Sequence, residues 1–472
     1  MDADTSVRGT GSAAAAGKAP APLAAPGGLA ATAAREAPSQ GWYLVFVMTV
    51  CYTLSFIDRQ ILSLLVGPIK ADLGISDTQV GLLGGLAFSL FYTLMALPLG
   101  RIVDRSNRRN LVVAGVAFWS AMTAACALAR GYGELFLARM GVGLGEAVLN
   151  PAAASMIADS FPREKLSSAL SVYSMGIYIG AGSALLVGGA VIQAVATTPT
   201  VVLPLVGEIA SWRATFLIVG LPGLLVALWV WTLREPSRRG AIVAADGAHA
   251  HLDIAATVRE LRRRAASLIA ISGGQMAFAV ALYAFMLWAP VYFQRVHAWS
   301  PGDAGTRLGL LVLVFGCAGM YAGGRIADRW FRQGQRDAAL RLGAWGGAIG
   351  CAAYGAAGFF EASPWLQLAL FAPGVFALAM PAGSCYAALQ LVLPNQVRGQ
   401  AIAIYLFVAN LGGLTLGPLL PGVLNDYAFA SEAAVGTSLA ITLAISTLAA
   451  GLIFGLGRRG YRRDYAAAHP EG

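Results

Sequence analysis

The residues that could do chemistry in this chain are four charges placed where charge is costly. Asp58 and Arg59 are adjacent within one long apolar stretch, and Arg139 and Glu146 lie seven residues apart within another. Insertion scales put each such residue at roughly +2.5 to 3.5 kcal/mol near the centre of a membrane helix. Residues of this kind usually face a bundle interior or a wet cavity, so the four charges indicate a buried site for protons or a charged ligand.

The spacing of the four charges predicts how they meet. Along a helix that starts near residue 42, Asp58 lies roughly 24 Å from the membrane surface, and Arg139 reaches a similar depth from the opposite direction. A separation of seven residues puts Arg139 and Glu146 on one helix face. We therefore expect Asp58 to pair with Arg139 or Arg59. Glu146 would lie deeper, with a less certain partner, which makes it the better candidate to bind a proton. The alternative is a fixed structural network of four charges.

Composition places these charges in a membrane protein. Of the 472 residues 57% are hydrophobic and 12% are charged, whereas soluble proteins carry about 25% charged residues. The net charge of +9 comes from basic residues in short loops between apolar stretches, which is a pattern of membrane orientation and not of nucleic-acid binding. The five cysteines have no metal-binding spacing and the four histidines lie in loops or the tail. We expect no metal and no cofactor, and any proton relay must use carboxylates.

Twelve apolar stretches are near or above the roughly 20 residues that a membrane-spanning helix needs. Their approximate limits are 42–66, 79–101, 110–129, 133–159, 166–195, 213–233, 267–294, 304–326, 338–360, 364–392, 399–424 and 432–456. We predict an all-α membrane protein with twelve transmembrane helices in two pseudo-symmetric six-helix halves. The predicted parts are a disordered tail (1–41), an amino-terminal bundle (42–233), a linker with a basic surface helix (234–266), a carboxy-terminal bundle (267–457) and a basic tail (458–472).

A repeated motif supports the division into two halves. Gly100-x-x-x-Asp104-Arg105 follows the second stretch, and the matching motif Gly324-x-x-x-Asp328-Arg329 follows the eighth. Two similar halves suggest a cavity between them that opens alternately to each side of the membrane. The glycines permit close approach of helices. The first motif continues to Arg108 and Arg109, for which Asp159 is the expected acidic partner.

These motifs resemble a known transporter family. The loop from Gly100 to Arg109, together with Arg139-x-x-x-Gly143, is similar to the signature of the major facilitator superfamily. Phe56-Ile-Asp58-Arg59 and Gly143-Leu-Gly-Glu146-Ala resemble its spinster-like branch, which includes proton-coupled transporters of lysolipids and sphingolipids. The resemblance implies that Asp58 and Glu146 are a protonatable pair, with Arg59 and Arg139 as partners. Organic-anion symporters of the same superfamily share these charges, so the resemblance supports coupling better than a lipid substrate.

The second half has no charge within its core stretches, but it carries amide and aromatic side chains. The candidates to line a cavity are Gln275, Tyr283, Trp288, Tyr386, Gln390 and Asn410. A charged half that faces an aromatic half suits an amphipathic ligand, whose polar end would meet arginine. Ordinary packing of these residues is the alternative.

The sequence therefore predicts a proton-coupled secondary active transporter that works by alternating access on an amphipathic, lipid-like molecule. An organic-anion symporter is the alternative substrate class, and a receptor or scaffold that does not transport is the alternative outside transport. We expect no enzyme, because no nucleophile–base set lies in the apolar stretches. About 26 of the 33 Lys and Arg fall on one side, which places both termini in the cytoplasm. Short loops and an Arg- and Ala-rich composition suggest a bacterial inner membrane, and the predicted fold needs no oligomer.

Overall fold

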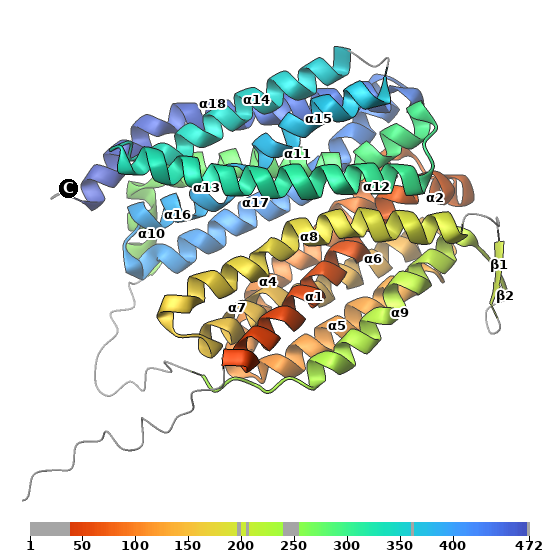
Figure 1. Cartoon of the computed structure of the whole chain (residues 1–472), viewed down its shortest axis with the longest axis horizontal. Coiled ribbons are helices and arrows are strands. Elements are labelled where there is room, and N and C mark those ends of the chain that lie inside the picture. Colours follow the sequence, from red (N-terminus) through yellow and green to blue (C-terminus); the bar gives the residue numbers. More distant parts are fainter. Residues whose placement is uncertain (1–37, 196–199, 204–206, 239–253, 360–362, 470–472) are drawn as a thin grey trace, which may run out of the picture.

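Two bundles of helices, one from each half of the chain, lie side by side along the length of the molecule (Figure 1). The computed structural model describes residues 38–195, 200–203, 207–238, 254–359 and 363–469. The amino-terminal half contains α1 (Pro38–Leu64), α2 (Val66–Leu73), α3 (Asp77–Gly84), α4 (Leu86–Arg105), α5 (Arg108–Cys126), α6 (Tyr132–Glu146), α7 (Leu149–Ser160), α8 (Arg163–Val195), β1 (Thr200–Leu203), β2 (Gly207–Ala210) and α9 (Ser211–Trp231).

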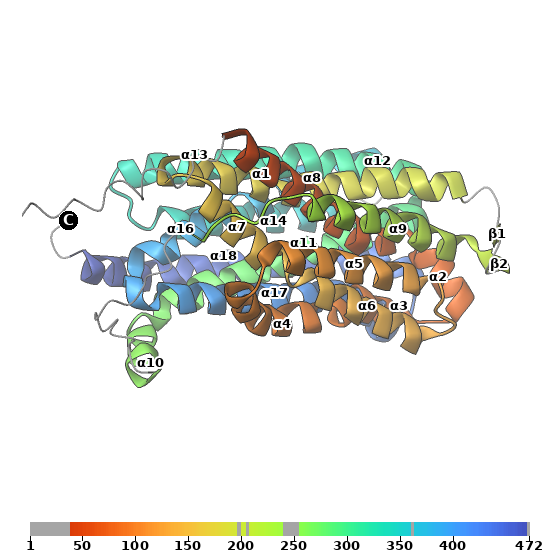
Figure 2. The same ribbon diagram turned by 90° about the horizontal axis from the view of Figure 1, so that it is seen from below.

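The carboxy-terminal half begins after a linker whose residues 239–253 lie outside the described part. It contains α10 (Ile254–Arg263), α11 (Ala265–His297), α12 (Pro301–Leu311), the π turn η1 (Val312–Gly316), α13 (Cys317–Arg332), α14 (Ala338–Phe359), α15 (Pro364–Ala379), α16 (Ala382–Val392), α17 (Asn395–Val423), η2 (Leu424–Ala428), η3 (Glu432–Ala434) and α18 (Val435–Ala468). Except for α10, its long helices run along the same direction as those of the first half (Figure 2).

Ten helices in the described part of the chain are long and apolar enough to cross a membrane. The two other predicted spans also fold as helices inside the bundles. They are the α6–α7 pair, in which α6 packs on α4 and α5, and α14, which packs on α15 and α18. The structure is an all-α membrane fold and is consistent with the twelve predicted spans.

Several spans are interrupted within the bundles. The fourth span ends α6 at Glu146 and begins α7 at Leu149. Pro151 explains this break, because a proline has no N–H to donate to the carbonyl of Ala147 four residues earlier. The tenth span likewise breaks at Pro381, between α15 and α16. The first of these breaks leaves the carboxylate of Glu146 at a helix end inside the bundle.

The two halves touch at one end of the molecule, here called the α2 end, where α8 packs on α12 and α3 packs on α17. A Cβ added to Gly305 would lie 2.3 Å from the carbonyl oxygen of Leu185, and one added to Gly81 would lie 2.6 Å from that of Pro418. These glycines allow the backbones of opposite halves to meet directly. Toward the other end, here called the α10 end, α8 and α13 diverge (Figure 1).

Three segments outside the predicted spans contain regular secondary structure. Helix α1 begins at Pro38, inside the predicted tail 1–41, whose residues 1–37 lie outside the described part. The segment between the fifth and sixth predicted spans contains the antiparallel hairpin β1–β2. The predicted basic tail 458–472 is helical in its described part, because α18 continues to Ala468.

Asp337 explains why α18 extends so far. Its Oδ2 accepts hydrogen bonds from Arg458 at 2.6 Å and from Arg462 at 2.9 Å, so basic residues of the predicted tail are held against the start of α14. Tyr461, between them, is buried and donates to the carbonyl of Ala388 at 3.0 Å. Burial alone would raise the pKa of Asp337, but the two arginines outweigh it and hold that pKa below its usual range.

Replacing Asp337 with asparagine is expected to destabilise the α14–α18 contact by roughly 1–3 kcal/mol, the usual range for hydrogen bonds to charged groups. Because the folded pKa is depressed, the wild-type contribution is complete above the unfolded value of about 3.9 and is lost as pH falls through the folded pKa. Thermal unfolding of the purified protein in detergent measures both effects. Asp303→Asn, at an exposed i,i+4 pair with Arg307, is the control. Equal melting temperatures for the two variants would contradict the assignment.

Candidate functional site

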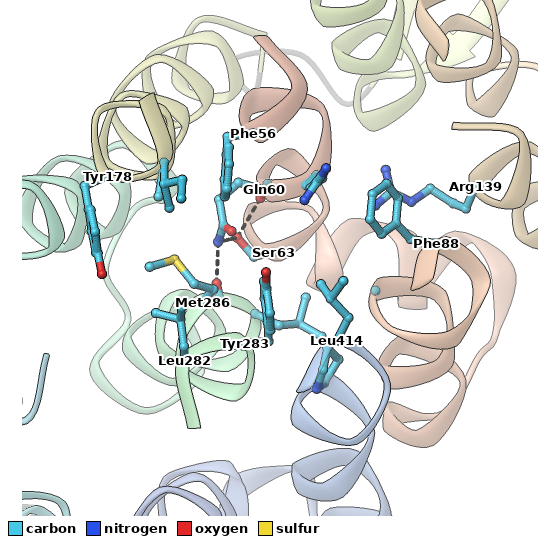
Figure 3. A pocket seen from close by; sticks show the side chains of 16 residues that line it. Phe56, Gln60, Ser63, Phe88, Arg139, Tyr178, Leu282, Tyr283, Met286 and Leu414 are labelled. Carbon is cyan, nitrogen blue, oxygen red and sulfur yellow. Dashed lines mark hydrogen bonds between the residues drawn. The ribbon is translucent and has the colours of Figure 1, made fainter. Parts of the chain in front are cut away.

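A pocket lies between the two halves, and two of the four charges that the sequence singles out, Arg59 and Arg139, line it (Figure 3). It encloses about 720 Å³ of space not occupied by atoms, part of it open solvent. The amino-terminal half lines it with Phe56, Arg59, Gln60, Ser63, Gly84, Phe88, Arg139, Ile177, Tyr178 and Ala181. The carboxy-terminal half lines it with Leu282, Tyr283, Met286, Leu287, Leu414 and Pro418. The lining is therefore largely apolar, with both arginines on one wall.

Glu146 and Arg59 form the central ion pair. The Oε2 atom of Glu146 lies 2.5 Å from Nη2 of Arg59, and it also accepts from Nε of Arg59 at 2.7 Å and from the hydroxyl of Ser55 at 2.5 Å. Ser55 and Arg59 are four residues apart on α1, so they lie one above the other on the face that meets the end of α6. The break after α6 allows the Glu146 carboxylate to meet both side chains of α1.

Aromatic rings hold the Arg59 guanidinium. Its central carbon lies 4.4 Å from the ring centroid of Phe88, 4.7 Å from that of Tyr92 and 5.1 Å from that of Phe56. A guanidinium over aromatic faces gains an electrostatic contribution of roughly 0.5–2 kcal/mol per contact, more when it is desolvated. These rings keep Arg59 charged and oriented toward the pocket even when its carboxylate partner changes.

Asp58 occupies a different environment, although it is adjacent to Arg59. Its side chain is fully buried, and neither carboxylate oxygen accepts a hydrogen bond of normal geometry from any described residue. Thr123 and Trp119 of α5 are the polar groups positioned to donate to it, and their polar atoms are also without partners in the described structure. Arg139 donates to the backbone carbonyl of Asp58 at 3.0 Å and not to its carboxylate.

This geometry corrects the predicted pairing. We expected Asp58 to pair with the side chain of Arg139 or Arg59 and Glu146 to have the less certain partner. The structure shows the reverse, because Arg59 pairs with Glu146 while Asp58 points toward α5. Consecutive residues on a helix differ by about 100° in direction, so Asp58 and Arg59 cannot both face the pocket.

A hydrogen-bonded group behind Arg59 was not predicted. Asn150 donates to the hydroxyl of Tyr92 at 2.9 Å and accepts from Tyr173 at 2.7 Å, and Tyr173 stacks on Tyr52 with ring centroids 5.0 Å apart. The signal in the sequence is the Asn–Pro pair in the middle of the fourth span. This network fixes the ring of Tyr92 that covers Arg59.

The carboxy-terminal wall differs from the predicted one. Tyr283 lines the pocket as expected (Figure 3). Trp288 does not, because its fully buried indole donates to the carbonyl of Pro418 at 2.8 Å. The remaining candidates also lie outside this pocket, namely Gln275, Tyr386, Gln390 and Asn410. Sequence reasoning missed Gln60, whose amide donates across the halves to the backbone carbonyl of Met286 and to Ser63 at 2.9 Å.

The continuation of the first loop motif, Arg108 and Arg109, contacts acidic side chains. Arg108 is buried; it pairs with the predicted partner Asp159 and with Glu235 at 2.8 Å, and donates to the carbonyl of Pro236 at 2.7 Å. The backbone N–H of Arg109 donates to Glu235 at 2.8 Å. Glu235, which lies after α9, was not predicted. Arg108 therefore ties the start of α5 to the ends of α7 and α9.

The other motif residues make fewer contacts. Arg105, Asp328 and Arg329 are exposed, and none of these side chains forms an ion pair with another described residue. The expected close helix approach is absent, since a Cβ on Gly100 or Gly324 would meet no atom within 4 Å. These glycines lie at the α10 end, where the halves diverge. The side chain of Asp104 lies outside the described residues.

A second charge network, here called the α2-end latch, joins the halves at the α2 end. Asp77 accepts both Nη atoms of Arg295, at 2.7 and 2.8 Å, and is 2.5 Å from Lys70. In the opposite direction, Asp426 accepts the backbone N–H of Thr78 at 2.6 Å. The α2-end latch consists of Lys70, Asp77 and Thr78 of the first half and of Arg295, Asn425, Asp426 and Glu432 of the second. This network was not predicted from the sequence.

Comparisons with known proteins agree with this architecture. The family model of the Major Facilitator Superfamily matches residues 48–415. An MFS-type efflux pump of Mycolicibacterium smegmatis is 28% identical, over 91% of this chain and 95% of its own length. A hexuronate transporter of Bacillus subtilis is 25% identical, over 81% of this chain and 87% of its own. A crystal structure of a bacterial homologue of the human lysosomal transporter Spinster, inward-facing and unoccupied, is 26% identical, with a TM-score of 0.73 over 91% of this chain and 98% of its own.

Proposed function

The chain belongs to the major facilitator superfamily, and from that premise we propose that it is a proton-coupled transporter that moves an amphipathic anion by alternating access. It is a multi-pass membrane transporter with a spinster-like fold. Proton coupling, the class of substrate and the orientation in the membrane are the parts that we propose. The observation that carries the proposal is the buried carboxylate of Asp58, which forms no ion pair and accepts no hydrogen bond of normal geometry from the described residues, beside two pocket arginines.

The contacts between the halves support an inward-facing state. Close backbone contacts and the latch hold the halves together at the α2 end, and the halves diverge at the α10 end. The excess of Lys and Arg in the loops of the α10 end orients that end toward the cytoplasm. We therefore propose that both termini lie in the cytoplasm of a bacterial cell and that the latch must open during the transport cycle.

The summed charge of the two acids and two arginines suggests how proton binding is coupled to substrate binding. With both acids ionised, the two acids and two arginines sum to zero, so each bound proton leaves one arginine charge uncompensated. A buried carboxylate that forms no ion pair with a described residue is costly, which makes Asp58, rather than the Arg59-paired Glu146, the better proton carrier in this conformation. A protonated Asp58 no longer attracts Arg139, and a substrate anion in the pocket then balances the positive charge. One proton and one monoanion cross together without net charge.

The pocket lining supports an amphipathic anion. Arg59 and Arg139 lie on one wall, whereas Leu282, Met286 and Leu414 form an apolar wall opposite. A headgroup with a phosphate or carboxylate would meet arginine, and a chain would lie along the apolar wall. The second candidate is a small organic acid, such as a sugar acid, because a relative is a hexuronate transporter and Gln60, Ser63 and Tyr283 can bind hydroxyl groups.

Proton uptake in liposomes tests the proposal. Purified protein is challenged with lysophospholipids and with hexuronates, and internal pH is followed by a trapped dye. We expect proton movement with the lysophospholipids and its loss in Asp58→Asn. Movement with hexuronates alone would replace the lipid-like class by the organic acid. Substrate movement without proton movement would refute coupling, and a pH response that Asp58→Asn keeps would refute the role of Asp58.

A further inference from the structure

Helix α10 is oriented unlike the other helices of the carboxy-terminal half. The spans run along the long axis of the molecule, whereas α10 lies across that axis and projects sideways from the α10 end (Figure 2). A helix perpendicular to the spans, at the level where they end, lies parallel to the membrane surface. The position of α10 therefore places it beside the bundle, where lipid headgroups surround the protein.

The sequence of α10 is amphipathic and basic. Val258 and Leu261 are three residues apart and share one face, while Arg259 and Arg263 lie on another. The last turn carries Arg262 and Arg263. A short helix with an apolar stripe and a basic face is the pattern of helices that lie in the membrane interface.

One end of α10 is fixed to the bundle, whereas Val258, Arg262 and Arg263 on the helix are exposed. Arg264, just after the helix, donates to the carbonyl of Val392 and to that of Asp464 at 3.1 Å, and Leu261 packs against the core. Val258, although apolar, is 41% exposed, and the side chain of Arg263 is 78% exposed. The exposed face thus pairs an apolar side chain with guanidinium groups.

We propose that α10 binds the anionic headgroup layer of the bilayer, with Arg262 and Arg263 on lipid phosphates and Val258 at the acyl boundary. Each basic residue near an anionic membrane surface contributes about 1 kcal/mol, or roughly fivefold in partition. The lipid contact would hold the start of α11, and with it the carboxy-terminal half, at a fixed height in the membrane. This proposal does not depend on the substrate or on proton coupling.

A polarity-sensitive fluorophore on Val258→Cys tests the proposal in the full chain. Cys317 and Cys351, which are half-buried, are first replaced by alanine. In vesicles that contain phosphatidylglycerol we expect a blue-shifted emission, which phosphatidylcholine vesicles do not give. Arg262→Gln with Arg263→Gln should lower the ratio of membrane-bound to water-exposed probe by about 25-fold, fivefold for each arginine.

Two features make the outcome decisive. The replaced arginines are exposed and Arg264 is kept, so the hydrogen bonds from Arg264 to Val392 and Asp464 remain, and Arg263→Gln removes only its own 3.5 Å pair with Glu260. A fluorophore on Gln333→Cys, in the exposed turn after α13 at the same end, should report water in both kinds of vesicle. Water-exposed emission from Val258→Cys in phosphatidylglycerol would overturn the proposal, as would a blue shift that persists unchanged in the double arginine variant.

Discussion

Asp58→Asn is expected to abolish substrate-driven proton movement while substrate exchange across the membrane continues. Asparagine is close in shape to a protonated aspartate but cannot release a proton, so it leaves the transporter permanently in one charge state. The pH dependence of transport should disappear with the proton movement. Arg59→Gln should instead lose exchange itself, because it removes the charge that faces the pocket between Phe88 and Tyr92.

Asp58→Asn and Glu146→Gln should differ in their effect on the free energy of unfolding. Asp58 has no hydrogen-bond partner of normal geometry among the described residues, so Asp58→Asn removes an uncompensated buried group and should change the free energy of unfolding by less than about 1 kcal/mol or increase it. Glu146→Gln leaves Arg59 without its carboxylate and should cost about 2–4 kcal/mol. Thermal unfolding of both variants in detergent measures this contrast. If Asp58→Asn proves the more destabilising variant, Asp58 has a structural partner and cannot be the free proton carrier.

The sequence was sufficient for the fold and for the identity of the charges, but not for their pairing. Apolar length gives the spans, and the cost of buried charge singles out Asp58, Arg59, Arg139 and Glu146. Depth along a helix cannot tell which way a side chain points around it. Asp58 and Arg59 diverge by about 100°, and the break after α6 turns Glu146 toward α1. The divergence follows from helix geometry, but which side chain faces the pocket depends on contacts between helices and cannot be read from spacing alone.

The carboxy-terminal wall of the pocket was harder to predict for a related reason. Amide and aromatic residues inside an apolar span have two uses, packing and ligand contact, and the sequence does not distinguish them. The indole N–H of Trp288 donates its hydrogen bond to the carbonyl of Pro418. Tyr283, on the same helix, instead lines the pocket. The latch was missed because its acids lie at helix ends near the membrane surface. A charged residue there costs little, so its presence alone does not indicate a functional site.

The α2-end latch should control which side of the transporter is open. Asp77 receives two hydrogen bonds from Arg295 and one from Lys70, and the Arg295 pair crosses between the halves. Asp77→Asn removes the charge from these contacts, and we expect it to weaken the closed α2 end by about 2–4 kcal/mol. At 1.4 kcal/mol per factor of ten, the equilibrium between the two states would shift roughly 30- to 700-fold toward opening at this end.

Spin labels on Gly67→Cys in α2 and Ala433→Cys in the facing half report this opening, because both positions are exposed at the α2 end. Asp72→Asn is a matched control, since Asp72 pairs with Arg213 at 2.9 Å at the same end but within one half. The distance between labels should lengthen in Asp77→Asn and stay unchanged in Asp72→Asn. An unchanged distance in both variants would mean that the close glycine contacts, such as Gly305 on Leu185, hold the α2 end shut without the charges. The latch would then only align the halves after closure, and substrate release would depend on backbone packing and not on electrostatics.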